Sequence, residues 1–181
     1  MEARFNYVEA AHGAFKAMLG LGQYLHQCGL EESLLHLINL RASQINGCTY
    51  CLDMHWKDLR ASGENEQRLY SLDAWRESPF YTDREPAALE WTEAITLIGN
   101  GQVPDEVYEQ VRPHFSEKEL SDLTLAVVTI HGWNRLNISA PTVPGDDQPA
   151  KPYRVERSMR TASICTETTA KPRMAGPPCA T

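Results

Sequence analysis

The chain has 181 residues and a net charge of −7, with 42% hydrophobic and 23% charged residues. This length is sufficient for one domain with its own core and is short for two. No apolar run approaches the roughly 18 residues of a membrane span, and the first residues lack the basic start and continuous apolar stretch of a signal peptide. We therefore expect a cytoplasmic protein without a membrane partner.

The charge is unevenly distributed along the chain. Residues 141–181 contain six Lys/Arg and four Asp/Glu, so they carry +2 and residues 1–140 carry −9. An acidic body of this kind repels phosphate backbones, which argues against nucleic acid as a partner. Seven of the eleven prolines also lie in 141–181, without hydrophobic periodicity. We therefore predict one domain over 1–140 and a disordered or loosely docked tail over 141–181, in which Cys165 and Cys179 have no assigned function.

Helical spacing of apolar residues begins near the N-terminus. Asn6 can cap a first helix that extends to about Leu25, and Gly29 would end it. A second helix fits residues 31–45, after which Asn46 and Gly47 form a break. A third helix opens at residue 48 and runs to about residue 62. These segments predict consecutive helices joined by short turns.

The second half of the chain continues the pattern. A short helix is predicted up to about residue 75, followed by a connector and a Thr82/Glu85 capping box before a helix that ends near residue 98. Pro104 fits the first position of a helix over 105–114, and a Ser116/Glu119 capping box precedes a long apolar helix to about residue 139. No alternating segment or hairpin turn indicates strands. The predicted fold class is all-α, a helical bundle.

The segment from Cys48 to His55 carries the chemically informative residues. Cys48 and Cys51 are three apart at the predicted start of a helix, where unsatisfied N–H groups and the helix dipole favour a thiolate. His55 lies four residues after Cys51, on the same helical face, and an imidazole can take a thiol proton near neutral pH. A nucleophile, a second thiol and a base therefore lie within eight residues.

Three other interpretations of these residues are possible. Structural zinc needs four ligands, and this segment offers only three candidates without a second CxxC. Both cysteines can also be small buried apolar residues. Haem attachment requires a His directly after the second Cys, where the chain has Leu52. The glycine break and His55 favour redox chemistry over these alternatives.

Residues 40–55, LRASQINGCTYCLDMH, resemble the signature of alkylhydroperoxidase D-like proteins in the carboxymuconolactone decarboxylase superfamily. Residues 72–81, 90–94, 115–120 and 133–136 resemble the same branch, and the similarity covers roughly residues 5–139. The resemblance implies an all-helical fold assembled as trimers or hexamers. It also implies hydroperoxide reduction by a cysteine pair, with electrons from a dithiol protein or small thiol. No haem, flavin or metal cofactor is implied.

The resemblance assigns roles within the cysteine pair. Cys51 matches the cysteine that becomes the sulfenic acid, Cys48 the one that resolves it to a disulfide, and His55 the proton-relay histidine. The family relay usually has a Glu twelve residues before the first Cys, and His36 occupies that position here. We include His36 as a candidate because it lies on the preceding helix. A carboxymuconolactone decarboxylase-like enzyme and a non-enzymatic redox-sensing or metal-binding oligomer remain alternatives.

Overall fold

The computed structural model describes residues 4–145 and 148, and all the regular elements in this part of the chain are helical. This confirms the predicted all-α class. None of these helices has both the length and the apolar composition that crossing a membrane would require. The elements are α1 (Tyr7–Ala10), α2 (His12–Leu25), α3 (Glu32–Asn46), α4 (Thr49–Ala61), α5 (Glu66–Tyr70), η1 (Leu72–Glu77), α6 (Arg84–Thr96), η2 (Ile98–Asn100), α7 (Asp105–Val111), η3 (Arg112–His114) and α8 (Glu117–Ser139).

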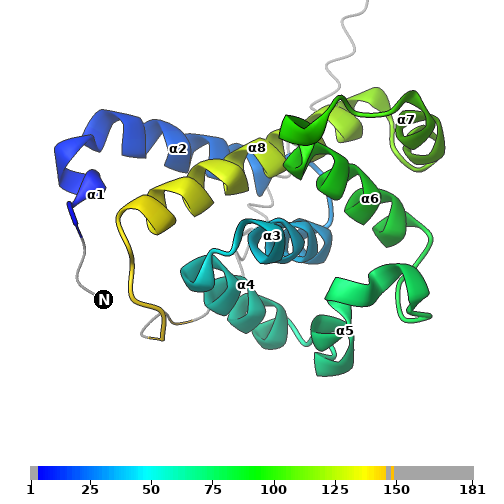
Figure 1. Cartoon of the computed structure of the whole chain (residues 1–181), viewed down its shortest axis with the longest axis horizontal. Coiled ribbons are helices and arrows are strands. Elements are labelled where there is room, and N and C mark those ends of the chain that lie inside the picture. Colours follow the sequence, from blue (N-terminus) through cyan, green and yellow to red (C-terminus); the bar gives the residue numbers. More distant parts are fainter. Residues whose placement is uncertain (1–3, 146–147, 149–181) are drawn as a thin grey trace, which may run out of the picture.

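Helix α3 occupies the centre of the bundle. It packs against α4, α6 and α8, while α2 runs beside the long helix α8 (Figure 1). Seven residues of α3 are buried, which is consistent with a helix that has neighbours on several sides. The cysteine pair follows directly after this central helix, so it is held by the best-packed part of the fold.

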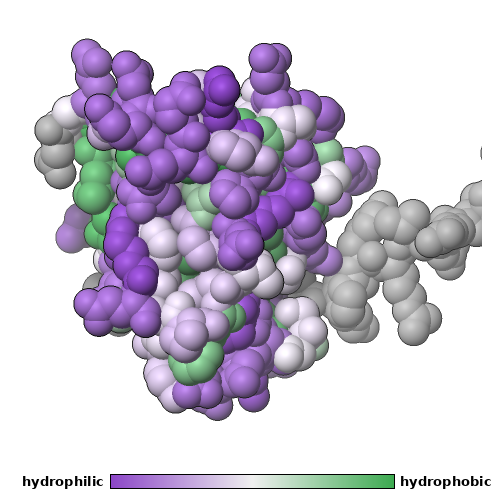
Figure 2. Space-filling view, turned by 90° about the vertical axis from the view of Figure 1, so that its right-hand side faces the viewer, coloured by the Kyte–Doolittle hydropathy of each residue, from purple (hydrophilic) through white to green (hydrophobic). Residues whose placement is uncertain are grey.

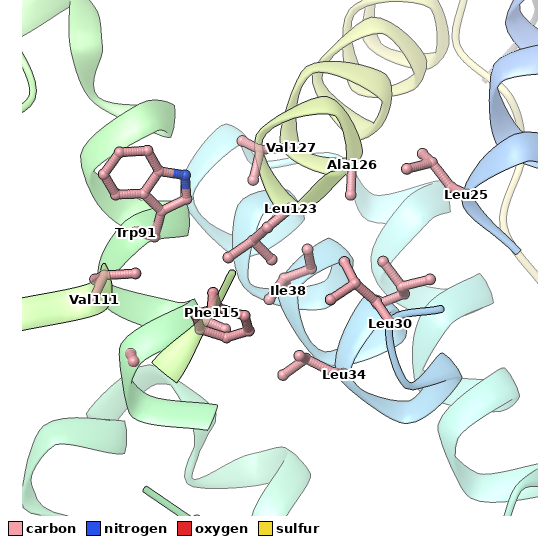
Figure 3. Close-up of a cluster of buried hydrophobic side chains, with 13 residues drawn as sticks. Leu25, Leu30, Leu34, Ile38, Trp91, Val111, Phe115, Leu123, Ala126 and Val127 are labelled. Atoms are coloured by element: carbon pink, nitrogen blue, oxygen red, sulfur yellow. The ribbon is translucent and has the colours of Figure 1, made fainter. Parts of the chain in front are cut away.

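A hydrophobic core joins α3, α6 and α8. Ile38 of α3 and Leu123 of α8 are fully buried and lie near Phe115 and Trp91 (Figure 3). A second cluster of buried residues, which includes Leu59 and Leu72, lies where α4, α5 and η1 meet α3 and α6. Each of these buried side chains contributes about 1.5–3 kcal/mol to the stability of the fold, relative to the same side chain exposed to water. Together the clusters fix the position of α4 on the bundle.

The structure confirms the capping box of α8. The Ser116 hydroxyl accepts a hydrogen bond from the Glu119 N–H at 3.3 Å, and the Glu119 carboxylate accepts from the Ser116 N–H at 2.9 Å. The first predicted helix, in contrast, is broken at Ala11, whose φ of −128° and ψ of 45° are not helical. No residue of α1 is buried, so no core contact holds the two segments in one helix, and the break lets Tyr7 reach Asn137.

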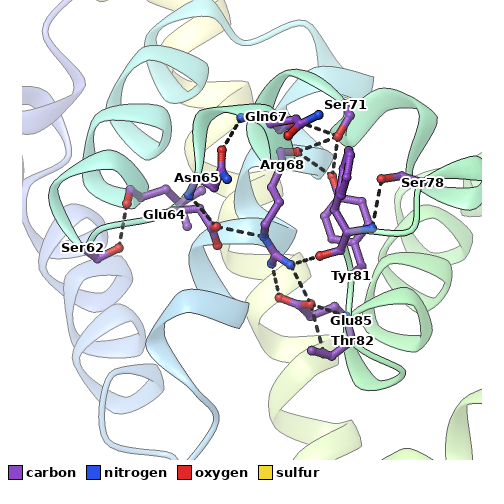
Figure 4. A network of polar contacts seen from close by, with 12 residues as sticks. Ser62, Glu64, Asn65, Gln67, Arg68, Ser71, Ser78, Tyr81, Thr82 and Glu85 are labelled. Carbon is purple, nitrogen blue, oxygen red and sulfur yellow. Dashed lines mark hydrogen bonds and ion pairs between the residues drawn. The ribbon is translucent and has the colours of Figure 1, made fainter.

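The predicted capping box at Thr82 and Glu85 is only partly formed. Helix α6 begins at Arg84, and the Glu85 carboxylate accepts a hydrogen bond from the Thr82 N–H at 2.7 Å. The same carboxylate pairs with Arg68, whose guanidinium also binds Glu64 (Figure 4). Glu85 therefore connects α5 to the start of α6. This tertiary role explains why the local capping pattern is incomplete.

The helix predicted over 105–114 also differs in detail. Pro104 is the residue before the helix, with an extended ψ of 142°, rather than its first position. Helix α7 ends at Val111 and continues as the 3₁₀ turn η3, which contains Pro113. Proline has no N–H to continue the α-helical hydrogen bonds, so the tighter turn follows.

The face on the α6 and α7 side of the molecule is mainly hydrophilic (Figure 2).

Candidate redox site

The glycine break places the first cysteine at the start of α4. Gly47 has a φ of 70° and a ψ of 33°, the left-handed conformation that glycine adopts most easily. The following N–H, that of Cys48, donates to the Ser43 carbonyl at 3.1 Å and closes the end of α3. Cys48 is then the N-cap residue of α4, and Cys51 lies in its first turn. The prediction that the CxxC pair opens a helix is confirmed.

Both sulfur atoms are buried, and their environments separate their pKa values. Cys48 is 1% exposed and Cys51 is fully buried. A hydrogen bond from the Cys51 thiol lowers the pKa of Cys48 to about 7, and backbone N–H groups of the first turn of α4 add to this effect. The same hydrogen bond, together with burial, raises the pKa of Cys51 well above its usual value. In the reduced pair, the thiolate is therefore on Cys48 and the proton is on Cys51.

Two asparagines of α8 complete the surroundings of the pair. Asn134 donates to the Ser43 hydroxyl at 3.0 Å and accepts from Asn46 at 2.9 Å, which ties α8 to the last turn of α3. Asn137 donates from Nδ2 to the Cys51 Sγ at 3.7 Å. Sequence reasoning missed both residues. Their segment shows only two amide side chains three apart in the last turns of a helix, which does not by itself indicate a contact with the cysteines.

His55 lies one turn after Cys51 on α4 and is 6% exposed. Its Nδ1 is 3.4 Å from the Nδ1 of His36, so the structure brings these two predicted residues together. Burial, with a smaller contribution from neighbouring histidines, lowers the pKa of His55 to about 3, and burial also lowers the pKa of His36. Both imidazoles are therefore neutral at neutral pH.

A direct hydrogen bond between Cys51 and His55, which the four-residue spacing allows, is not formed. The Nε2 atom of His55 is buried and has no hydrogen-bond partner in the described part of the chain. The reason is the orientation of the imidazole, whose other nitrogen faces His36 and Asp58. The Asp58 Oδ2 lies 3.9 Å from the Nδ1 of each histidine. His36, His55 and Asp58 thus form a compact group beside the cysteines.

A cavity of about 900 Å³ borders the site. Cys51, His55 and His36 contribute to its wall, whereas Cys48 does not. The rest of the wall is largely apolar and comes from residues 5–8, from α2, α3, α4 and α8, and from residues 140–143. It includes Phe15, Met18, Tyr50, Met54, Ile130 and Trp133. This volume can hold an organic molecule beside Cys51.

The family model of the carboxymuconolactone decarboxylase family matches residues 13–94, which include the four predicted site residues Cys48, Cys51, His36 and His55. The uncharacterized protein YdfG of Bacillus subtilis (strain 168) is 45% identical over 139 residues, which are 77% of this chain and 95% of YdfG. The chain belongs to the carboxymuconolactone decarboxylase family. Within this family, its resemblance to the AhpD-like branch is also supported by solved structures.

Two solved structures show the same fold. A protein of unknown function from Agrobacterium tumefaciens, described as a candidate antioxidant defence protein AhpD, is 41% identical with a TM-score of 0.75. That match covers 83% of this chain and 100% of the other. A peroxidase-related protein with an AhpD core from Ralstonia eutropha JMP134 is 19% identical with a TM-score of 0.68, covering 77% of this chain and 74% of that one. The second likeness concerns the fold alone.

Proposed function

We propose that this family member is a thiol-dependent hydroperoxide reductase in which Cys48 and Cys51 alternate between dithiol and disulfide. The observation that carries the proposal is a pair of buried sulfur atoms at the start of α4, one of which, that of Cys51, borders a largely apolar cavity; the lowered pKa of Cys48 is consistent with it. A thiolate is the form that reacts with peroxides, and a second thiol close by is needed to resolve the product. The AhpD-like relatives are consistent with this chemistry.

In the first step, Cys51 attacks the distal oxygen of a hydroperoxide held in the cavity. The proton of the Cys51 thiol passes to the Cys48 thiolate, to which this thiol already donates a hydrogen bond. The S–O bond forms as the O–O bond breaks, which gives a sulfenic acid on Cys51 and an alkoxide that takes up a proton to leave as the alcohol. Asn137 donates to the Cys51 sulfur and stabilises the negative charge on it once its proton has passed to Cys48.

In the second step, Cys48 attacks the Cys51 sulfenic acid. The new S–S bond displaces hydroxide, which is protonated to water, and leaves the Cys48–Cys51 disulfide. One proton in total comes from solvent in the two steps. We assign its delivery to His55 and His36, because both border the cavity and lie 3.4 Å apart at their Nδ1 atoms. The low pKa of His55 makes it a relay rather than a strong base.

The disulfide must be reduced before another turnover. We propose a dithiol protein or a small thiol as the electron donor, in a reducing compartment such as the cytoplasm, where such disulfides are recycled. The resemblance to the AhpD-like branch further leads us to propose a homo-oligomer, a trimer or hexamer. Sedimentation of the purified chain measures this directly.

The test is consumption of cumene hydroperoxide with dithiothreitol as donor. We expect turnover by the native chain and a loss of at least about 100-fold in Cys51→Ser, because the nucleophile is removed. Cys28→Ser is the matched control, since Cys28 is a partly buried thiol outside the cavity wall. Mass spectrometry after peroxide treatment should find a Cys48–Cys51 disulfide. Full turnover in Cys51→Ser would refute the proposal.

A further inference from the structure

Three side chains beside the cysteines bring metal-binding atoms to one point. The Nδ1 atoms of His36 and His55 are 3.4 Å apart, and the Asp58 Oδ2 is 3.9 Å from each. Two imidazole nitrogens and a carboxylate oxygen are a common ligand set for divalent transition metals. The proton relay proposed above uses the two imidazoles, but it does not require Asp58 to converge on them. The group therefore calls for an explanation beyond the thiol chemistry.

The spacing of the three atoms fits a metal ion closely. A point equidistant from them lies about 2.2 Å from each, and Zn–N and Zn–O bonds are about 2.0–2.2 Å long. This point lies in the plane of the three ligand atoms. If these atoms moved toward one another by a few tenths of an ångström, the ion would lie out of their plane at normal bond lengths. That is the pyramidal arrangement of a three-ligand zinc site. No large rearrangement of the helices is needed.

The ligand atoms are held by well-packed helices. His36 lies on the central helix α3, and both His55 and Asp58 lie on α4, the helix most extensively packed against α3. His55 and Asp58 are 6% and 9% exposed. A site on two packed helices is pre-organised, so binding requires little ordering of side chains.

A neighbouring carboxylate orients one of the ligands. The Glu32 Oε1 lies 3.9 Å from the His36 Nε2, one turn earlier on α3. A carboxylate there favours a hydrogen on Nε2, which leaves the Nδ1 lone pair directed toward His55 and Asp58. Metal-binding histidines commonly have such a partner on the second ring nitrogen.

We propose that His36, His55 and Asp58 form a binding site for a divalent first-row transition metal, with Zn²⁺ as the representative ion. All three residues border the cavity, so the remaining coordination position is reached from it and takes a water molecule or another small ligand. The cysteines are not ligands in this site. The metal site shares the Nδ1 atoms of His36 and His55 with the proton relay proposed above, so a bound ion would replace that relay, but its binding requires neither cysteine.

The experiment uses the untagged full chain carrying Cys48→Ser and Cys51→Ser, which removes both thiols of the pair as competing ligands. After treatment with a chelator, this parent is titrated with Zn²⁺ by calorimetry. We expect one Zn²⁺ per chain with a Kd in the micromolar range or tighter. Adding His36→Ala or Asp58→Asn should weaken binding by at least about tenfold. His114→Ala, which removes an exposed histidine on η3, should bind as the parent does.

Two results would overturn the proposal. One is the absence of saturable Zn²⁺ binding by the parent when circular dichroism shows it to be helical. The other is unchanged affinity in both His36→Ala and Asp58→Asn. Because either substitution can disturb folding, Co²⁺ spectra of the native chain provide a second measurement. Nitrogen and oxygen ligands give weak visible bands alone, whereas a strong sulfur-to-cobalt band would assign the metal to the cysteines and contradict our assignment.

Discussion

Asn137 of α8 donates a hydrogen bond from Nδ2 to the sulfur of Cys51 on α4, at 3.7 Å. The carbonyl oxygen of the same amide accepts from the Tyr7 hydroxyl at 3.2 Å and from the Thr142 hydroxyl at 2.7 Å. These two donors fix which way the amide points. The sulfur therefore always faces an N–H group and never the amide oxygen.

We predict that Asn137→Ala lowers kcat/KM for cumene hydroperoxide roughly tenfold, because a hydrogen bond to a developing thiolate contributes about 1.5–3 kcal/mol at most. Steady-state kinetics at pH 7 measure this change. Thr142→Val is the matched control, since it removes a partner of the amide oxygen and leaves the donor to Cys51 in place. An equal loss in both variants would contradict a specific role for the donor.

The Cys48 thiolate should be visible in the pH dependence of the pair. Because its pKa is lowered to about 7, the thiolate is lost as the pH falls through 7 and is present above it. The difference in ultraviolet thiolate absorbance between the native chain and Cys48→Ser should therefore show a midpoint near pH 7. In Cys51→Ala the hydrogen-bond donor is missing, so this midpoint should move upward. A midpoint that stays near 7 in Cys51→Ala would exclude Cys51 as the cause.

We predict that Gly47→Ala destabilises the protein by about 1–2 kcal/mol, because an L-residue is strained at its positive φ. Urea unfolding followed by circular dichroism measures the free energy of unfolding. Gly20→Ala is the control. Gly20 lies within α2 with open space around its Cα, so alanine there should be neutral or stabilise by about 0.5–1 kcal/mol. Equal effects at the two positions would be inconsistent with strain at Gly47.

The core prediction concerns two leucines on the same helix. Leu123 is fully buried between α3, α6 and α8, whereas Leu125 is 38% exposed. We expect Leu123→Ala to lower the free energy of unfolding by about 2–5 kcal/mol through lost burial and a cavity. Leu125→Ala should cost less than about 1 kcal/mol. Urea midpoints of the two variants measure this difference in the free energy of unfolding. Similar midpoints would show that α8 is not packed as described.

Local patterns along the chain were sufficient to predict most of the helices. The glycine at 47 and the Ser116/Glu119 pair are local signals, since the atoms that define each turn lie within a few residues. The break at Ala11 was not predictable in this way. It accompanies the hydrogen bond between Tyr7 and Asn137, which are 130 residues apart along the chain.

The candidate site likewise contains residues that local spacing predicts and residues that only the packing of helices brings together. Cys48, Cys51 and His55 could be identified from their spacing on one helix. Asn134 and Asn137 reach the pair only because α8 packs across α3 and α4, and nothing in their own segment indicates that contact. The proximity of His36 to Asp58 likewise depends on the packing of α3 against α4. Most of residues 141–181, including Cys165 and Cys179, lie outside the described part of the chain.

In the redox cycle that we propose, the depth of the two sulfur atoms restricts which electron donors can reach them. Cys48 and Cys51 expose about 1% of their surface or less, so a thiol on a flat protein face cannot touch a disulfide between them. The reductant must instead extend a thiol into the cavity, on a slender flexible arm or as a small free molecule. In that cycle the same cavity would admit the donor as well as the oxidant, so the two would compete for it.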